Sequence, residues 1–412
     1  MEEALERYRT LLTPAAEIRN RITRIQRLLQ EASLDGLLVL QTVDLFYFSG
    51  TLQDGTLWIP CDGEAVLLVR RSLERALSES PLHEIHALES PKLLAHWIGR
   101  TPSRRIGLEL DVLPAREFLR IQQLLPGTSL EDAASLIRRV RQIKSPYEIQ
   151  WMRDAGKRQA RVYGQLPRWI QEGRTELELS AEIERALRLE GHQGLVRLRR
   201  WINELHYGPV VSGPNACYPN SFDGPVGALG LCPAVPQGAG TRRMRRNEPI
   251  LVDVTFGYNG YLVDKARTYS IGDLSGQGKE AYALCRQILD ETLSRMKPGV
   301  LCSTLYQEVM GPLEKHAFWP HLMGTGQNKV RFLAHGVGLE LDEWPLLAPR
   351  FDVELAPGMT IALEPKIFLP GIGGIGLENT YLITDLVPEK LTDSPDDLVV
   401  VDPYGAAGMA RD

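Results

Sequence analysis

Five residues in the C-terminal half of the chain have side chains that could together hold metal ions: Asp253, Asp264, His335, Glu364 and Glu378. Four carboxylates and one imidazole suit manganese, cobalt, iron or catalytic zinc, whereas a structural zinc site is usually built from thiolates. Two divalent ions would cancel the charge of the four carboxylates. The set therefore predicts a two-metal site, and the chemistry of such a site is the activation of water for hydrolysis.

The first carboxylate pair lies in a predicted β-hairpin over residues 250–269. Two β-rich runs flank the Asn-Gly dipeptide at 259–260, which is typical of a two-residue hairpin loop. In this register Asp253 lies opposite Ala266, so Asp253 and Asp264 share one face at roughly 7 to 8 Å between backbone positions. Two carboxylates this close, on a mostly apolar or small face, favour a cation between them. The alternative is a pair of solvated aspartates on an exposed face.

The second carboxylate pair lies in another predicted hairpin, whose turn is centred near Pro370 to Ile372. Glu364 then lies within about one residue of the position opposite Glu378, and like charges opposed across a ladder destabilise it. A bound cation would relieve this repulsion. A lone histidine beside glycines is more often packed or exposed than a ligand, so the assignment of His335 depends on the carboxylates.

The order of the five residues resembles that in the pita-bread metallohydrolases, which include aminopeptidase P, prolidase, methionine aminopeptidase and the metal-free creatinase. An aspartate, a second aspartate eleven positions on, His-Gly-x-Gly, Glu-Pro and a glutamate before a β-rich run follow one another as in that family. The loop at 212–215 is similar to the family's loop upstream of the first hairpin. The resemblance covers nearly the whole chain.

The resemblance implies a dinuclear metal-dependent hydrolase, an aminopeptidase or dipeptidase of the Xaa-Pro type, in which a metal-bridged hydroxide attacks an amide carbonyl. Asp253 is expected to bind one ion through both oxygens, and Asp264 and Glu378 to bridge two divalent ions. His335 and Glu364 would complete the other ion's site. Glu364 is also expected to act as the catalytic general base. Manganese is favoured by the resemblance over cobalt, zinc and iron.

The residues around the predicted metal site depart from those of proline-specific members. The chain has Asn220 where these carry a substrate-binding histidine in the upstream loop, and Asp342 where they carry another seven residues after the ligand histidine. Both are candidate substrate residues, and Asp342 favours a substrate with a cationic amine. Gly376 replaces the usual arginine two residues before the last glutamate, and Lys366 follows Glu-Pro where glycine is common.

Three other histidines, His206, His316 and His321, could supply the missing imidazoles, although each is more often structural or exposed. Two further functions stay open. One is metal-dependent hydrolysis of a non-peptide C–N bond, and the other is non-catalytic binding on the same fold. The complete ligand set argues against a mere binding protein, because four clustered carboxylates would destabilise it.

Helix signals indicate a domain boundary near residue 143. Ser145 and Glu148 form a predicted capping box, and Thr175 begins a second helix. Upstream, helices alternate with short apolar strands, beginning with an amphipathic helix that carries Ile18, Ile22, Ile25 and Leu29. We expect a mixed α/β (α+β) chain with a creatinase-like N-terminal domain over 1–142, a pita-bread catalytic domain over 143–402 and a loose tail over 403–412.

Length and composition are those expected of a two-domain cytoplasmic enzyme. The 412 residues carry a net charge of -5, and the basic patches at 197–200 and 242–246 are more typical of solvated loops than of a nucleic-acid site. Five scattered cysteines fit a reducing compartment. No apolar run approaches the roughly 18 residues that span a membrane. The expected partners are a small peptide or amide substrate and, from the resemblance, a second copy in a homodimer. We expect neither a nucleic acid nor a membrane.

Overall fold

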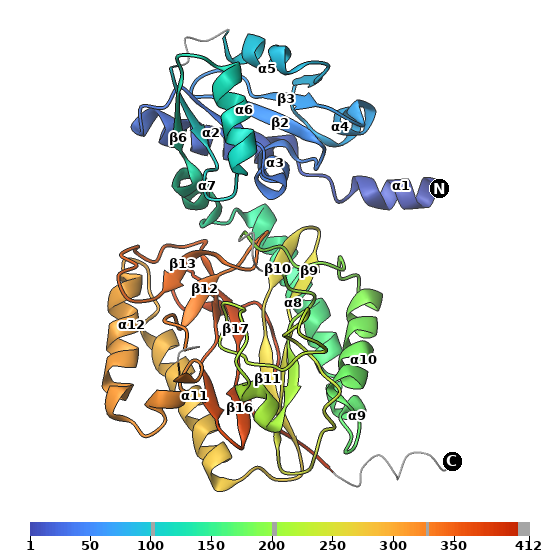
Figure 1. Ribbon diagram of the computed structural model, residues 1–412, viewed down its shortest axis with the longest axis vertical. Coiled ribbons are helices and arrows are strands. Elements are labelled where there is room, and N and C mark those ends of the chain that lie inside the picture. The colour runs from blue at the N-terminus through green and yellow to red at the C-terminus, as the bar shows by residue number, and fades with distance from the viewer. Residues whose placement is uncertain (100–103, 200–203, 327–328, 403–412) are drawn as a thin grey trace. The chain divides into compact units, whose positions relative to one another are not determined.

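The computed structural model describes residues 1–99, 104–199, 204–326 and 329–402 (Figure 1). The chain divides into two compact units, Met1–Arg141 and Gln142–Asp412. Both units combine helices with sheets, so the predicted mixed α/β class is confirmed. The predicted loose tail, 403–412, lies outside the described residues.

The first unit is built around a six-stranded sheet with strand order β4-β3-β2-β1-β5-β6. Its apolar core includes the predicted stripe of helix α2, where Ile18, Ile25 and Leu29 are fully buried. The elements in chain order are α1 (Glu2–Arg9), α2 (Ala15–Glu31), β1 (Gly36–Val39), α3 (Thr42–Ser49), β2 (Gly55–Pro60), β3 (Val66–Val69), α4 (Leu73–Glu79), β4 (Glu84–Ala87), α5 (Pro91–Ile98), β5 (Arg105–Leu108), α6 (Ala115–Leu124), β6 (Ser129–Asp132) and α7 (Ala134–Arg141).

The second unit begins with helices and continues with mostly antiparallel strands. Both predicted capping boxes are present, at Ser145 with Glu148 and at Thr175 with Glu178. The first elements are α8 (Pro146–Tyr163), α9 (Leu166–Trp169), α10 (Glu176–Leu189), β7 (Val210–Ser212), η1 (Gly213–Cys217), β8 (Pro249–Asp253), β9 (Phe256–Tyr258), β10 (Tyr261–Val263), β11 (Ala266–Ile271), α11 (Gly276–Arg295) and α12 (Cys302–Met310).

The remaining elements of the second unit are short helical turns followed by strands. They are η2 (Gly311–Lys315), η3 (Trp319–His321), β12 (Ala334–Gly336), β13 (Glu343–Leu347), β14 (Thr360–Leu363), β15 (Lys366–Leu369), β16 (Gly373–Gly376), β17 (Asn379–Leu382), β18 (Glu389–Lys390) and β19 (Val399–Val401). The larger sheets have the orders β19-β11-β8-β7 and β13-β12-β14-β17-β18, and the hairpins β10-β9 and β15-β16 form two further two-stranded sheets.

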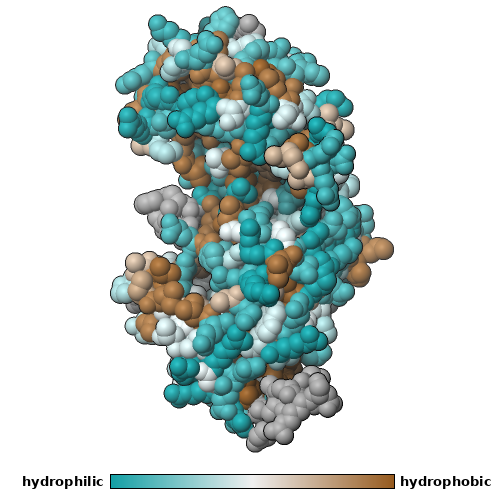
Figure 2. All heavy atoms as spheres, turned by 90° about the vertical axis from the view of Figure 1, so that its right-hand side faces the viewer, coloured by the Kyte–Doolittle hydropathy of each residue, from teal (hydrophilic) through white to brown (hydrophobic). Residues whose placement is uncertain are grey.

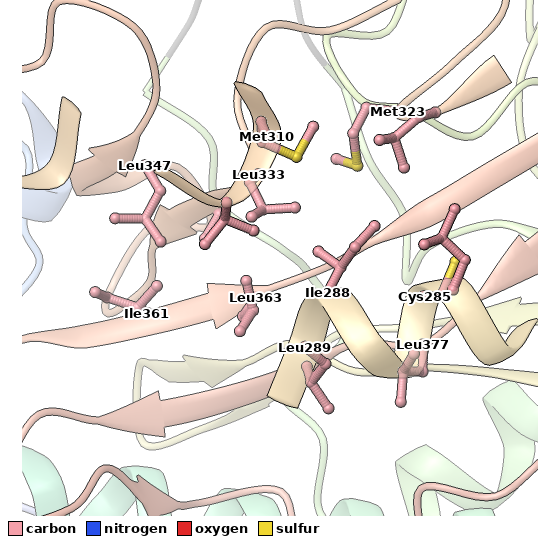
Figure 3. Close-up of a cluster of buried hydrophobic side chains, with 14 of the residues drawn as sticks. Cys285, Ile288, Leu289, Met310, Met323, Leu333, Leu347, Ile361, Leu363 and Leu377 are labelled. Carbon is pink, nitrogen blue, oxygen red and sulfur yellow. The ribbon is translucent and has the colours of Figure 1, made fainter. Parts of the chain in front are cut away.

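The main apolar core of the second unit packs helices α11 and α12 against these strands. Figure 3 shows part of it, with Cys285, Ile288 and Leu289 of α11 in one cluster with Leu363 of β14 and Leu377. Burial of apolar side chains is the main favourable contribution to folding. It gives the strands that carry the predicted ligands a rigid support.

The surface agrees with the charged composition of the chain. Hydrophilic residues cover most of the face of the molecule shown in Figure 2. Within the described ranges, no helix combines the length and the apolar character that crossing a membrane requires.

Candidate metal centre

The first hairpin has the predicted register. Tyr258 pairs with Tyr261 across the Asn-Gly loop, and Asp253 pairs with Ala266 where β8 meets β11. Asp264 lies two residues before Ala266, so its side chain lies near that of Asp253. Asp253 and Asp264 are 8% and 6% exposed, which rules out the alternative of two solvated aspartates on an open face.

The second hairpin brings its two glutamates face to face. Leu363 pairs with Asn379 on one side and Lys366 with Gly376 on the other, and both pairs have the same register. That register places Glu364 opposite Glu378, as the sequence predicts. Such opposition of like charges requires a compensating cation.

All five predicted ligand residues come together in the second unit. Ligand atoms of Asp264, His335 and Glu378 lie within 4.8 Å of one another, and so do those of Asp253, Glu364 and Glu378. His335 Nε2 lies 3.6 Å from Glu364 Oε1 and 3.9 Å from Glu378 Oε1. The two groups share Glu378, so they form one continuous buried cluster.

Neighbouring groups orient two of the ligands. Asp264 Oδ1 accepts hydrogen bonds from Lys265 N at 2.9 Å and from Thr255 Oγ1 at 3.2 Å, and Thr380 Oγ1 accepts one from Asp264 N at 2.8 Å. His335 Nδ1 lies 3.0 Å from the carbonyl oxygen of Gly336. A carbonyl can only accept, so Nδ1 carries the proton and the Nε2 lone pair is left for a ligand.

Lys366 lies among the carboxylates. Its Nζ is 2.9 Å from Asp253 Oδ2, 2.5 Å from Glu364 Oε2 and 2.7 Å from Glu378 Oε2, and the residue is fully buried. Sequence reasoning noticed this lysine as a departure from the family pattern but gave it no place in the site. Its position directly after Glu364-Pro365, two residues from a ligand on the same strand face, was the available signal.

The residues fit one divalent ion better than two. Glu378 Oε1 is buried and has no hydrogen-bond partner among the described residues, and it faces His335 in the group with Asp264. One ion in that group would satisfy the orphaned oxygen. In the group of Asp253, Glu364 and Glu378, by contrast, the Lys366 ammonium already contacts one oxygen of each carboxylate.

The electrostatics of the cluster favour a bound cation. Burial raises the pKa of Asp253 to about 7, although the nearby charge of Lys366 opposes this shift. Burial and the charge of Asp253 raise the pKa of Asp264, and burial and the charge of Asp264 raise that of Glu378. Burial alone would lower the pKa of His335, but Glu364 and Glu378 outweigh it and raise the pKa. Asp253, Asp264 and Glu378 therefore resist ionisation even with the Lys366 ammonium nearby, and a further cation would favour their ionised forms.

The metal-free protein is expected to lose stability as the pH rises from about 4 to about 7. The pKa of Asp253 is 3.8 in the reference state and about 7 in the folded chain. The folded state therefore binds more protons in this window, and its stability falls as they leave. Melting temperatures in a chelator between pH 4 and pH 8 check this, with Asp253→Asn as the comparison. The wild type should lose more stability than the variant, and equal slopes would contradict the assignment.

The two candidate substrate residues have different surroundings. Asn220 lines a cavity of about 650 Å³ together with Phe332, whose ring contacts that of His335 at 6.1 Å between centroids. Its Nδ2 donates to Val226 O at 3.1 Å, so its amide also holds the loop. Asp342 Oδ1 accepts a hydrogen bond from Arg199 N at 3.3 Å. A substrate role for either residue stays a prediction.

Two of the three other histidines have local partners, whereas His321 Nδ1 has no hydrogen-bond partner among the described residues. His206 Nε2 lies 3.2 Å from Glu184 Oε2, and His316 Nδ1 accepts a hydrogen bond from Phe318 N at 3.1 Å. His321 lies in the short turn η3. In the described ranges, the groups that could hold a metal contain none of these three residues.

Comparison with known proteins finds relatives over most of the chain. The model of metallopeptidase family M24 matches residues 150–385, and that of the creatinase/prolidase N-terminal domain matches residues 21–143. A probable dipeptidase, PepE, of Mycobacterium tuberculosis is 26% identical in an alignment of 388 positions that covers 90% of this chain and 93% of that protein. The Xaa-Pro dipeptidase of Pyrococcus furiosus is 25% identical over 93% of this chain and all of that protein. The structure of an Xaa-Pro dipeptidase from Bacillus anthracis superposes with a TM-score of 0.79 at 22% identity and covers 93% of this chain and 99% of that one.

Proposed function

We propose, from the premise that the chain belongs to metallopeptidase family M24, that it is a metal-dependent peptidase acting on dipeptides or on the amino-terminal bond of short peptides. The observation that carries this proposal is the buried convergence of Asp264, His335 and Glu378, with one Glu378 oxygen left without a partner. The names of the relatives, dipeptidase and Xaa-Pro dipeptidase, support the same reaction class.

The reaction assigned to the site is hydrolysis of an amide bond. When bound by Asp264, His335 and Glu378, a divalent ion supplies Lewis-acid chemistry, which acidifies water and polarises a carbonyl. The chain's own residues hold that ion in a dry site. Burial there strengthens each electrostatic interaction with the substrate.

Glu364 is the proposed general base. Its Oε2 is held by Lys366 at 2.5 Å, while its Oε1 lies on the side of His335. Lys366 thereby orients the Glu364 carboxylate and leaves Oε1 free to accept a proton. That oxygen takes a proton from the attacking water and delivers it to the leaving nitrogen.

The cavity beside His335 is the proposed substrate site. Aromatic residues line it, including Tyr218, Phe332 and Phe368, and its charged lining residues are Lys329, Arg331 and Asp223. The cavity lining has two cationic side chains, Lys329 and Arg331, and one carboxylate, Asp223. This excess of positive charge favours a substrate that bears a carboxylate near the cut bond, as a dipeptide does. We therefore propose a dipeptidase in preference to an aminopeptidase for longer peptides.

Xaa-Pro and Xaa-Xaa dipeptides test the proposal, each with a free or an amidated carboxyl end and with a free or an acetylated amino end. We expect hydrolysis of dipeptides with free ends, loss of hydrolysis in a chelator, and recovery with manganese, cobalt or zinc. Amidation should lower kcat/KM by about tenfold or more if a charged contact is lost. A metal-bound protein that hydrolyses no peptide would favour a non-peptide C–N bond as substrate. A protein that binds no metal would favour a binding function.

Three finer points stay predictions, the first two from the resemblance and the third from composition and cysteine usage. They are manganese as the native metal, a homodimer as the assembly, and the cytoplasm as the compartment. All five cysteines are free thiols in the described chain, which is compatible with that compartment.

A further inference from the structure

We infer that Lys366 is a built-in cation that takes the place of a second metal ion, so that the centre holds one divalent ion per chain. The inference deepens the proposed metal-dependent function and rests on it. It differs from the two-ion site that the order of ligands predicts, and it concerns the number of ions bound and the residue that limits it.

The ammonium of Lys366 has a full set of partners. An ammonium group has three N–H donors, and Lys366 Nζ has three carboxylate contacts, at 2.5, 2.7 and 2.9 Å. The three acceptors belong to Glu364, Glu378 and Asp253, which are the members of one of the two possible metal groups. The ammonium therefore satisfies that group as a bound ion would.

A metal ion and the ammonium cannot both be held by all three of these oxygens at once. A divalent transition metal binds carboxylate oxygens at about 2.0 to 2.2 Å, and the ammonium nitrogen lies only 2.5 to 2.9 Å from the same three atoms. An ion ligated by all three atoms would have to occupy the position of the ammonium. Lys366 is fully buried, so its ammonium cannot move into solvent to make room for an ion.

The neighbouring strand β16 leaves room for the Lys366 side chain. Lys366 pairs directly with Gly376 across the β15–β16 ladder. A Cβ at position 376 would lie 2.8 Å from Lys366 Cγ and 2.5 Å from Pro365 O, closer than real Cβ contacts. The missing side chain at 376 therefore leaves the space through which the lysine reaches the carboxylates.

The charge balance points the same way. Asp253, Asp264, Glu364 and Glu378 carry four negative charges when ionised. One ammonium and one divalent ion leave a single net negative charge, whereas an ammonium and two divalent ions would make a buried site positive. Burial of an uncompensated charge is costly in either sign, but the two-ion state also places three cations in mutual repulsion.

Metal titration of the full-length protein tests the inference. The metal-free chain is titrated with Mn²⁺ by calorimetry, and bound metal is counted by elemental analysis after gel filtration. We expect one ion per wild-type chain and two per chain in Lys366→Met and in Lys366→Gly. Each variant is purified with Mn²⁺ so that the buried carboxylates that lose the lysine's charge are compensated. The matched control is Lys265→Met. Lys265 is also fully buried, but its Nζ lies 4.3 Å from the Tyr163 ring centroid, so its loss should leave the count at one.

Each outcome decides between the alternatives. Two ions in the wild type would overturn the inference while leaving the proposed metal-dependent function intact. One ion in the wild type and one in the folded Lys366 variants would show that the lysine does not exclude the second ion. If neither variant folds, anomalous diffraction from manganese-soaked wild-type crystals decides: a single peak beside Asp264 and His335 supports the inference, and a second peak at Asp253 contradicts it. No bound ion at all would contradict the proposed function itself.

Discussion

Replacing Asp264 by Ala is expected to abolish metal retention and to lower kcat/KM by about 10³-fold or more. Asp264 is one of three residues in the group that fits an ion, and its carboxylate is already oriented by Lys265 N and Thr255 Oγ1. Lewis-acid catalysis lowers the activation barrier by several kcal/mol, and about 1.4 kcal/mol corresponds to a factor of ten in rate. The backbone contacts of Asp264 with Thr380 do not use the carboxylate, so the fold should persist.

The measurement combines metal content by elemental analysis with kcat/KM on a dipeptide. Asp273→Ala is the control, because Asp273 is an exposed aspartate of the same unit whose carboxylate pairs with Lys279 on the surface. It should keep both metal and activity. An Asp264→Ala protein that is fully active without bound metal would refute the ligand assignment.

Glu364→Gln is expected to lower kcat by about 10² to 10⁴-fold while the protein still binds metal. General acid–base catalysis contributes a factor of this size, and an amide cannot take a proton from water at neutral pH. Asp264, His335 and Glu378 remain to hold the ion. The amide oxygen of glutamine can still accept from Lys366, so the strand geometry should be kept.

The test is kcat, KM and metal content of the variant beside those of Glu389→Gln, a half-exposed glutamate that pairs with Arg153. The loss should fall on kcat more than on KM, since the base acts in the transition state. A Glu364→Gln enzyme within tenfold of the wild-type kcat would show that another residue is the base.

The hairpins could be predicted from the sequence because their turns are specified locally. The Asn-Gly loop at 259–260 sets the pairing of Asp253 with Ala266, and the Pro-Gly region at 370–371 sets that of Glu364 with Glu378. A hairpin's register follows from its turn, so short-range signals were enough to bring each pair together. The family, too, was evident from the order of the five residues, and the match to M24 confirms it.

What could not be predicted depends on contacts between distant segments. The turn that pairs Glu364 with Glu378 also pairs Lys366 with Gly376, but the contact of Lys366 Nζ with Asp253 joins two segments that lie far apart in the chain. The complete burial of Lys366 could not be predicted either, because lysine side chains are usually exposed. Likewise, the offset of Asp342 from His335 did not reveal its hydrogen bond with Arg199 N, which comes from a segment far away in the chain.

The pairing of Lys366 with Gly376 has a consequence for how the enzyme would respond to metal scarcity. A cation that is covalently part of the chain is never lost by dilution or chelation. Activity would then follow a single binding event, and would rise hyperbolically with free metal concentration instead of with its square. A chain of this kind needs half the metal per molecule of a two-ion enzyme, and a joint change at the two paired positions of one hairpin would move a relative from one metal requirement to the other.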